Sequence, residues 1–173
     1  YTAPSLMMIP GAREVAVAVN SLSKSYNMAG WRLGMAVGNP DVINYLFTYK
    51  SQMDTSNFAP IFSAGVAALT GDQSWLEERN LIYKERRDLV VNGLRSAGFK
   101  LDIPKAAIYV WAALPGGYHD SIKYCADLLE ATGVSTTPGV VYGPHGEGNL
   151  RVSLGTPADR ISEAMERLVQ WSK

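Results

Sequence analysis

A lysine, two serines and an arginine within residues 21–34 have the types and spacing to hold a phosphorylated carbonyl compound. The segment reads Ser-Leu-Ser-Lys-Ser-Tyr-Asn-Met-Ala-Gly-Trp-Arg-Leu-Gly. The amine of Lys24 can bond to a carbonyl carbon. The hydroxyl of Ser21 can donate to a phosphate, and Arg32 can bind the same group through its bidentate guanidinium. Ser23 can either reach the phosphate or shape the turn.

This segment resembles the lysine signature of class I/II aminotransferases, which are fold type I enzymes dependent on pyridoxal 5'-phosphate (PLP). The signature is a small residue, an apolar residue, a small residue and Lys, then a short variable stretch, Gly, any residue, Arg, an apolar residue and Gly. Every required position is met here. The resemblance implies that Lys24 forms a Schiff base with PLP and that Ser21 and Arg32 bind the phosphate. Within the family, the segment is most similar to the aspartate and LL-diaminopimelate aminotransferase group.

A second arginine lies in a strand-like segment near the C-terminus. Residues 149–154 alternate, so that Leu150 and Val152 face one way and Arg151 faces the other. Periodicity alone therefore places Arg151 in solvent. The run Gly-Asn-Leu-Arg-Val-Ser-Leu, however, resembles the family segment whose arginine binds the substrate α-carboxylate. The resemblance implies this role for Arg151. Tyr109 and Trp111 are expected to pack, with lining of the substrate pocket as the alternative.

The elements that must position these residues suggest an α/β fold. A run of small and β-branched residues at 14–20 is typical of a buried strand in a parallel sheet, and ligands bind at the carboxyl ends of such strands. Other expected elements are a strand at 35–37, a helix opened by Asn39-Pro40, a helix at 60–69 stopped by Gly71, a long helix capped by Ser74 and ended by Gly98, paired strands at 99–102 and 108–113, a helix closed by Gly133, and a last helix capped by Thr156-Pro157.

The order of these elements predicts two domains. By resemblance, residues 1–70 are the end of the large PLP-binding domain, with a parallel sheet and helices. Residues 71–173 are then a small α+β C-terminal domain. Because the chain begins at Tyr1 and family members are longer, we expect a C-terminal fragment. The family's Asp for the pyridine nitrogen, its Tyr for the ring oxygen and its stacking aromatic would lie upstream, so the fragment alone is expected to be inactive.

Composition argues against several other classes of protein. Sixteen basic side chains balance sixteen acidic ones, so the charge favours neither nucleic acid nor a membrane surface as a partner. No apolar run approaches the roughly 20 residues that span a bilayer. Cys125 is the only cysteine in the chain, in keeping with a reducing cytoplasm. His119 and His145 have no third ligand nearby in sequence, so no metal site is expected.

The resemblance thus implies a PLP-dependent aminotransferase of amino acid biosynthesis that moves an amino group between an amino acid and a 2-oxo acid, as a cytoplasmic homodimer. Two alternatives stay open from the sequence. Another fold type I enzyme, such as a C–S β-lyase, would use the same lysine and arginines. A non-catalytic, aminotransferase-like effector domain of a transcription regulator would carry a DNA-binding module before this segment.

Overall fold

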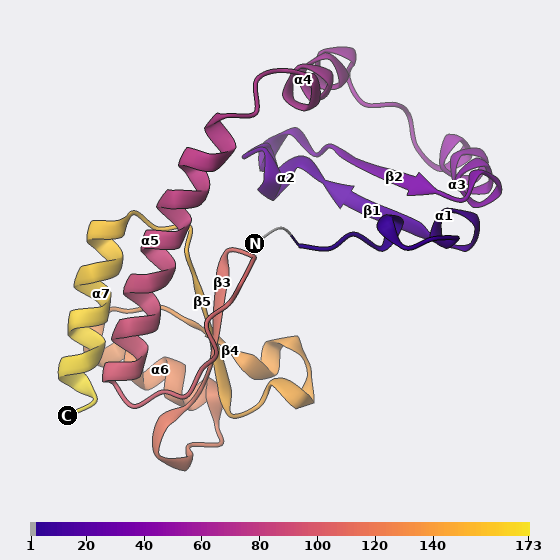
Figure 1. Cartoon of the computed structure of the whole chain (residues 1–173). Helices are drawn as coiled ribbons and strands as arrows, with labels where there is room; N and C mark the ends of the chain where they lie inside the picture. Colours follow the sequence, from indigo (N-terminus) through magenta and orange to yellow (C-terminus); the bar gives the residue numbers. More distant parts are fainter. Residues whose placement is uncertain (1–2) are drawn as a thin grey trace. The chain divides into compact units, whose positions relative to one another are not determined.

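The computed structural model describes residues 3–173, and the chain divides into two compact units. The first comprises the described residues up to Gln73, and the second is Ser74–Lys173. Both units combine helices with strands (Figure 1), so the expected mixed α/β fold is confirmed. The assignment of residues 1–70 to a large PLP-binding domain and of residues 71–173 to a small domain stays a prediction.

The first unit contains a two-stranded sheet of β1 (Val17–Ser21) and β2 (Gly34–Gly38). The strands are antiparallel, and their register pairs Val17 with Gly38 and Ser21 with Gly34. This pairing differs from the parallel arrangement expected for this part of the chain. A parallel neighbour requires a crossover, usually a helix, that returns the chain to its starting end. Residues 22–33 instead form compact turns, so the chain reverses direction.

Short helical segments precede β1 or lie between β1 and β2 in the sequence. They are η1 (Leu6–Met8), α1 (Ala12–Val15), α2 (Leu22–Ser25) and η2 (Ala29–Trp31). The strand expected from residue 14 begins only at Val17, because Glu14 and Val15 belong to α1. The expected second strand, at 35–37, is confirmed within β2.

Two longer helices, α3 (Pro40–Met53) and α4 (Ala59–Thr70), complete the first unit. Asn39 caps α3, and its Oδ1 accepts a hydrogen bond from the Val42 N–H at 2.9 Å. α4 ends at Gly71, as expected. The apolar residues of α3 are not buried: Val42 is 48% exposed and Phe47 is 68% exposed. Among the described residues α3 contacts β2, and Ile43 is partly buried, so the apolar side chains of this helix are only partly covered.

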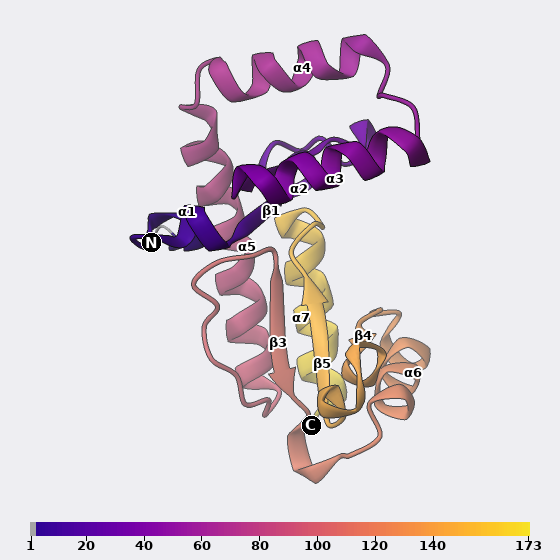
Figure 2. The same ribbon diagram turned by 90° about the vertical axis from the view of Figure 1, so that its right-hand side faces the viewer.

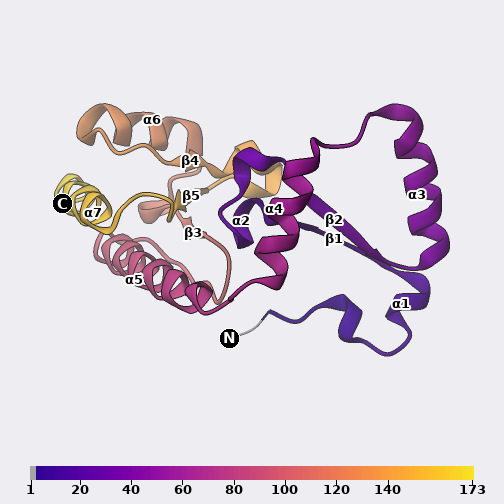
Figure 3. The same cartoon turned by 90° about the horizontal axis from the view of Figure 1, so that it is seen from above.

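The second unit is built on a three-stranded antiparallel sheet. Its order is β3 (Tyr109–Ala113), β5 (Asn149–Ser153) and β4 (Thr137–Pro138), with β5 in the centre (Figure 2). Three helices lie on one face of this sheet (Figure 3). They are α5 (Trp75–Ser96), α6 (Ser121–Thr132) and α7 (Ala158–Trp171). The connections between strands and helices contain short 3-10 turns: η3 (Pro115–Gly117), η4 (Gly139–Tyr142) and η5 (Pro144–Gly146).

The hydrophobic core lies between this sheet and its helices. Val110, Leu150 and Leu154 contribute from the sheet side, and Leu94 and Leu168 from α5 and α7. The predicted alternation of residues 149–154 is therefore confirmed, and the last helix buries Ile161, Met165 and Leu168 in the same core.

The ends of two helices and the burial of a cysteine in the second unit also agree with the residue types at these positions. Gly98 and Gly133 adopt the left-handed conformation that ends α5 and α6. Cys125 is buried in the core, as expected for a position on the apolar face of its helix. Burial raises the pKa of its thiol.

Three details in the second unit differ from expectation. Residues 99–102 make a single bridge, Lys100 to Ala113, and β3 pairs with β5 instead. The Phe99 N–H donates to the Leu94 carbonyl, so this segment completes the helix end and leaves little backbone for a strand. Ser74 makes no side-chain cap, because its own φ and ψ (−59°, −35°) are already helical. Pro157, which has no capping side chain, is the N-cap of α7.

Candidate active site

Lys24 lies on a one-turn helix, α2, directly after strand β1. Ser21 begins this turn, and its Oγ accepts a hydrogen bond from the Ser23 N–H at 3.2 Å. The Ser21 hydroxyl donates to the Ser23 Oγ at 2.9 Å, and the Ser25 hydroxyl donates to the Ser21 carbonyl at 3.0 Å. Three serines therefore hold the backbone around Lys24. Ser23 shapes the turn, and the binding of a phosphate by Ser21 stays a prediction.

Arg32 belongs to the same closed loop as Lys24. The base of the loop is fixed by the pairing of Ser21 with Gly34 and by a hydrogen bond from the Leu22 N–H to the Leu33 carbonyl at 3.1 Å. Arg32 itself is left-handed, with φ 52° and ψ 43°, a conformation uncommon outside glycine. Its Nη1 donates to the Ala29 carbonyl at 2.9 Å. Lys24 and Arg32 are both exposed within the first unit.

The fourth predicted site residue, Arg151, lies on the central strand of the second unit. Its side chain is on the face opposite the helices, where it is only partly exposed. The guanidinium carbon is 4.1 Å from the centroid of the Tyr109 ring and 4.7 Å from that of the Tyr142 ring. The Nε is buried and has no hydrogen-bond partner among the described residues. The Arg151 guanidinium therefore contacts two aromatic rings and is partly buried, in contrast to the exposure that alternation alone suggested.

Strand register explains how the rings reach Arg151. Trp111 on β3 lies directly opposite Arg151, and Tyr109 is its diagonal neighbour on the same face, within reach of long side chains. Tyr142 comes from η4 and makes an edge contact with Trp111, with ring centroids 5.8 Å apart. Tyr109, Trp111 and Tyr142 are called the aromatic cage below. Tyr109 packs against Arg151, as expected of a packing residue, whereas Trp111 contacts Tyr142 and is 41% exposed.

The loop that carries Tyr142 is folded tightly upon itself. A Cβ added at Gly139 would lie 2.0 Å from the Gly146 carbonyl oxygen, so the two backbones approach more closely than any side chain permits. Ser121, fully buried at the start of α6, accepts a hydrogen bond from the Val140 N–H at 3.4 Å through its Oγ. The helix and the loop are thereby joined.

Glu147 makes the second connection between this loop and α6. One carboxylate oxygen accepts from the Ser121 N–H at 2.6 Å and from the Gly148 N–H at 2.8 Å. The hydrogen bond from Gly148, followed by that from Ser121, lowers the pKa of Glu147. Neither Glu147 nor Tyr142 was predicted from the sequence as part of the site. The only sequence signal for either was an aromatic and an acidic residue inside a glycine-rich stretch.

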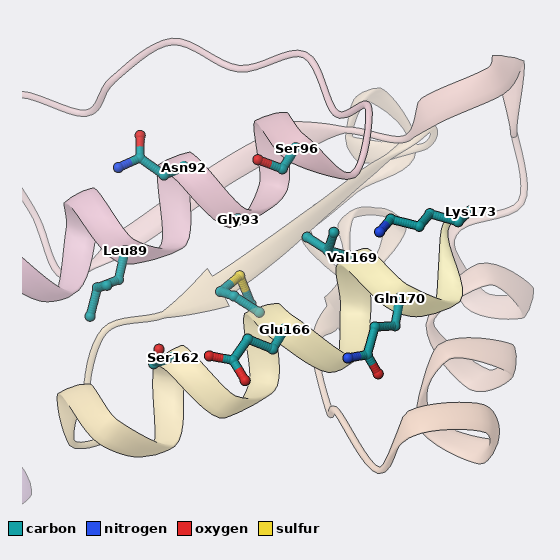
Figure 4. A pocket seen from close by; sticks show the side chains of 10 residues that line it. Leu89, Asn92, Gly93, Ser96, Ser162, Glu166, Val169, Gln170 and Lys173 are labelled. Atoms are coloured by element: carbon teal, nitrogen blue, oxygen red, sulfur yellow. The ribbon is translucent and has the colours of Figure 1, made fainter.

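A shallow groove in the second unit is separate from Arg151. It follows the seam between α5 and α7, with Leu89, Gly93 and Ser96 on one side and Ser162, Glu166 and Val169 on the other (Figure 4). These helices cover one face of the sheet, whereas Arg151 is on the other. The groove therefore takes no part in the arrangement of the predicted site residues.

Within residues 3–173, no three His, Cys, Asp or Glu side chains gather in a way that could hold a metal ion. In the same part of the chain, no helix has the length and apolar character needed to cross a bilayer.

The structure thus places the predicted residues in two groups. Ser21, Lys24 and Arg32 share one closed loop of the first unit, and Arg151 lies in the aromatic cage of the second. Within the first group, α2 contacts η2, the turn that Arg32 terminates.

Comparison with known proteins identifies the family of the chain. Residues 5–168 match the family model described as aminotransferase class I and II. The LL-diaminopimelate aminotransferase of Moorella thermoacetica is 49% identical over 168 residues, which are 97% of this chain and 43% of that protein. The enzyme of the same name from Natranaerobius thermophilus is 44% identical, covering 99% of this chain and 44% of that protein.

Solved structures give the same result. A probable N-succinyldiaminopimelate aminotransferase from Thermus thermophilus superposes with a TM-score of 0.91 at 35% identity, covering 97% of this chain and 45% of that one. An aromatic aminotransferase from Pyrococcus horikoshii gives 0.92 at 30% identity, with 99% and 46% covered. The chain therefore spans less than half the length of the relatives it matches, which agrees with the expectation of a fragment. It belongs to the class I and II aminotransferases, a family of PLP-dependent enzymes.

Proposed function

We propose that the protein containing this chain moves an amino group between an amino acid and a 2-oxo acid with PLP as its cofactor. The observation that carries the proposal is the buried Nε of Arg151, which lacks an acceptor among the described residues and belongs to a guanidinium that contacts two aromatic rings. A guanidinium held in this way is suited to bind a carboxylate. The names of the relatives support LL-diaminopimelate, or an amino acid like it, as the amino donor.

The chemistry of the Lys24 loop fits PLP. A primary amine, hydroxyl donors and a guanidinium are the groups that an aldehyde with a phosphate arm requires. Lys24 would hold the cofactor through a bond to its aldehyde carbon, and Ser21 and Arg32 would bind its phosphate. When bound, PLP supplies the electron sink for the substrate Cα. The amine of Lys24, once released, would accept the proton from that Cα as a general base.

Arg151 would orient the substrate. Its planar fork can bind the α-carboxylate in two parallel hydrogen bonds. A substrate whose α-carboxylate is bound in this way keeps its Cα–H bond in one orientation. Orientation of the reacting bond provides a large part of enzymatic rate acceleration. Rings that approach the guanidinium through cation–π contacts do not use its N–H groups, which stay available for the carboxylate.

The remaining expectations are part of the same proposal. Residues 1–70 would complete a large PLP-binding domain, and residues 71–173 would form the small domain. A cytoplasmic homodimer is proposed because the family resemblance implies it. The balance of sixteen basic and sixteen acidic residues supports small molecules over nucleic acids or membrane surfaces as partners.

Replacement of Lys24 tests the proposal. In the full-length protein, Lys24→Ala should abolish turnover, and treatment with PLP and borohydride should label position 24 in the wild type but not in this variant. Lys84→Ala, on the exposed side of α5, is the control and should keep both properties. Near-wild-type turnover in Lys24→Ala would refute the assignment. Formation of pyruvate and thiol from a cysteine conjugate, without a new amino acid, would favour a C–S β-lyase.

A further inference from the structure

The turn that bears Lys24 is attached to helix α4 at two points. Leu22, two residues before Lys24, is 1% exposed. A Cβ added at Gly65 of α4 would lie 2.4 Å from a methyl carbon of Leu33 and 3.7 Å from one of Leu22. The absence of a side chain at Gly65 therefore lets the helix contact the loop directly. This contact fixes the turn on its N-terminal side.

The second attachment is polar and follows Lys24 by two residues. The Tyr26 hydroxyl donates to the Oε1 of Gln73 at 3.0 Å, in a partly buried position. Tyr26 is also the C-terminal cap of α2, and its N–H donates to the Leu22 carbonyl at 3.0 Å. The residue that closes the Lys24 turn is thus bonded to a side chain 47 positions away in sequence.

Gln73 presents its carbonyl to Tyr26 in a fixed orientation. Its Nε2 donates to the Ala68 carbonyl at 3.0 Å and to the Gly71 carbonyl at 2.7 Å. Ala68 lies in the last turn of α4, where carbonyls lack partners within the helix. Both hydrogens of the amide are therefore used at the end of α4, and the oxygen can point only toward Tyr26. Gln73 therefore links the end of α4 to the turn that bears Lys24.

We propose that Gln73 is a positioning residue for Lys24, acting through the Tyr26 hydroxyl. This inference rests on the proposed function, in which the Lys24 amine must meet a cofactor carbon and later a substrate proton. A lysine side chain has a flexible four-carbon stem. Its amine can reach the same point repeatedly only if the backbone from which the stem begins is held in place. The contact of Leu22 with α4 fixes one end of that backbone and the Gln73 bond fixes the other.

Amide hydrogen exchange in the full-length protein without PLP tests the coupling directly. Gln73→Leu removes the bond and keeps the approximate size of the side chain, and Tyr26→Phe removes a single oxygen. Each should speed exchange in residues 22–33 by roughly three- to tenfold, the range expected for one neutral hydrogen bond. The double variant should be no faster than Gln73→Leu alone, because that variant has already lost the Tyr26 bond together with the two bonds from Gln73 to the end of α4. Gln170→Leu, at an exposed position of α7, should leave exchange unchanged.

The enzyme assay supplies the functional readout. With PLP bound, Gln73→Leu and Tyr26→Phe should lower kcat by a similar factor while KM for the amino donor stays constant, and the melting temperature of Tyr26→Phe should match that of Gln170→Leu. Unchanged exchange in residues 22–33, multiplicative effects in the double variant, or a raised KM with normal kcat would each overturn the proposal. Failure of borohydride to label Lys24 in the wild type would instead refute the proposed function and leave the exchange result standing.

Discussion

The guanidinium carbon of Arg151 lies 4.1 Å from the centroid of the Tyr109 ring. This stacking, with Tyr142 as a second aromatic contact, explains how a positive charge is kept partly buried on a sheet without a carboxylate among the described residues. Cation–π contacts are worth about 0.5 to 2 kcal/mol.

Loss of either ring should weaken substrate binding. In the full-length enzyme, Tyr142→Leu or Tyr109→Leu should raise KM for the amino donor by roughly two- to thirtyfold, the range that corresponds to one cation–π contact. The conservative changes Tyr142→Phe and Tyr109→Phe keep the ring and should have little effect. Steady-state kinetics with one amino donor decide the matter. Equal KM values in the Leu and Phe variants would show that the rings do not position Arg151.

Replacement of the guanidinium itself should have the larger effect. Arg151→Lys keeps the charge but loses the planar fork, so KM should rise by about tenfold or more for every amino acid substrate, since all share the α-carboxylate. Arg160→Lys is a matched control, because Arg160 forms a surface ion pair with Glu163 on α7 and such pairs contribute little. An Arg151→Lys enzyme with the KM of the wild type would exclude a carboxylate clamp.

The close approach of Gly139 to Gly146 predicts a steric effect on the same site. Gly139→Ala places a Cβ 2.0 Å from a backbone oxygen, so the loop must open and Tyr142 must move. We expect a lower melting temperature and a raised KM. Gly155→Ala should be tolerated, because its Cβ would meet only the Ser153 hydroxyl at 3.4 Å. Thermal denaturation and kinetics of the two variants provide the comparison, and equal behaviour would contradict the prediction.

Glu147 should make stability depend on pH in the acid range. Two backbone N–H groups lower its pKa in the folded state. A lowered pKa contributes stability that is present above the pKa of the unfolded chain and is lost as pH falls through the folded value. From about pH 5 downward, the wild type should therefore lose stability more steeply than Glu147→Gln. Glu130→Gln, an exposed change on α6, should keep the wild-type slope. Identical slopes for wild type and Glu147→Gln would disprove the linkage.

The sequence predicted helix ends and strands well where the residue types of one short segment determine the backbone conformation. Asn39 caps α3, Gly133 ends α6, and the alternation around Leu150 defines β5. Each depends on a property of one short segment. The strand expected at 99–102 failed for the opposite reason, because pairing is decided by which segment lies alongside, and β5 is 36 or more residues beyond β3.

The site was predictable only in part for the same reason. The Lys24 loop is contiguous, so its residue types could be interpreted from the sequence directly. The aromatic cage combines β3, β5 and η4, and the hydrogen bond between Tyr26 and Gln73 joins positions 47 apart. No periodicity within one segment indicates such contacts. Alternation correctly placed Arg151 on the face away from the core, but it could not show that Tyr142 packs over that face.

The buried thiol at Cys125 offers a practical route to observing these loops. Its apolar surroundings and raised pKa leave little thiolate for reaction with maleimides or iodoacetamides. A cysteine introduced at Val141, which is 65% exposed and adjacent to Tyr142, would therefore take up a fluorophore or spin label ahead of the native one. Within this chain, the wild-type background already serves as the unlabelled reference.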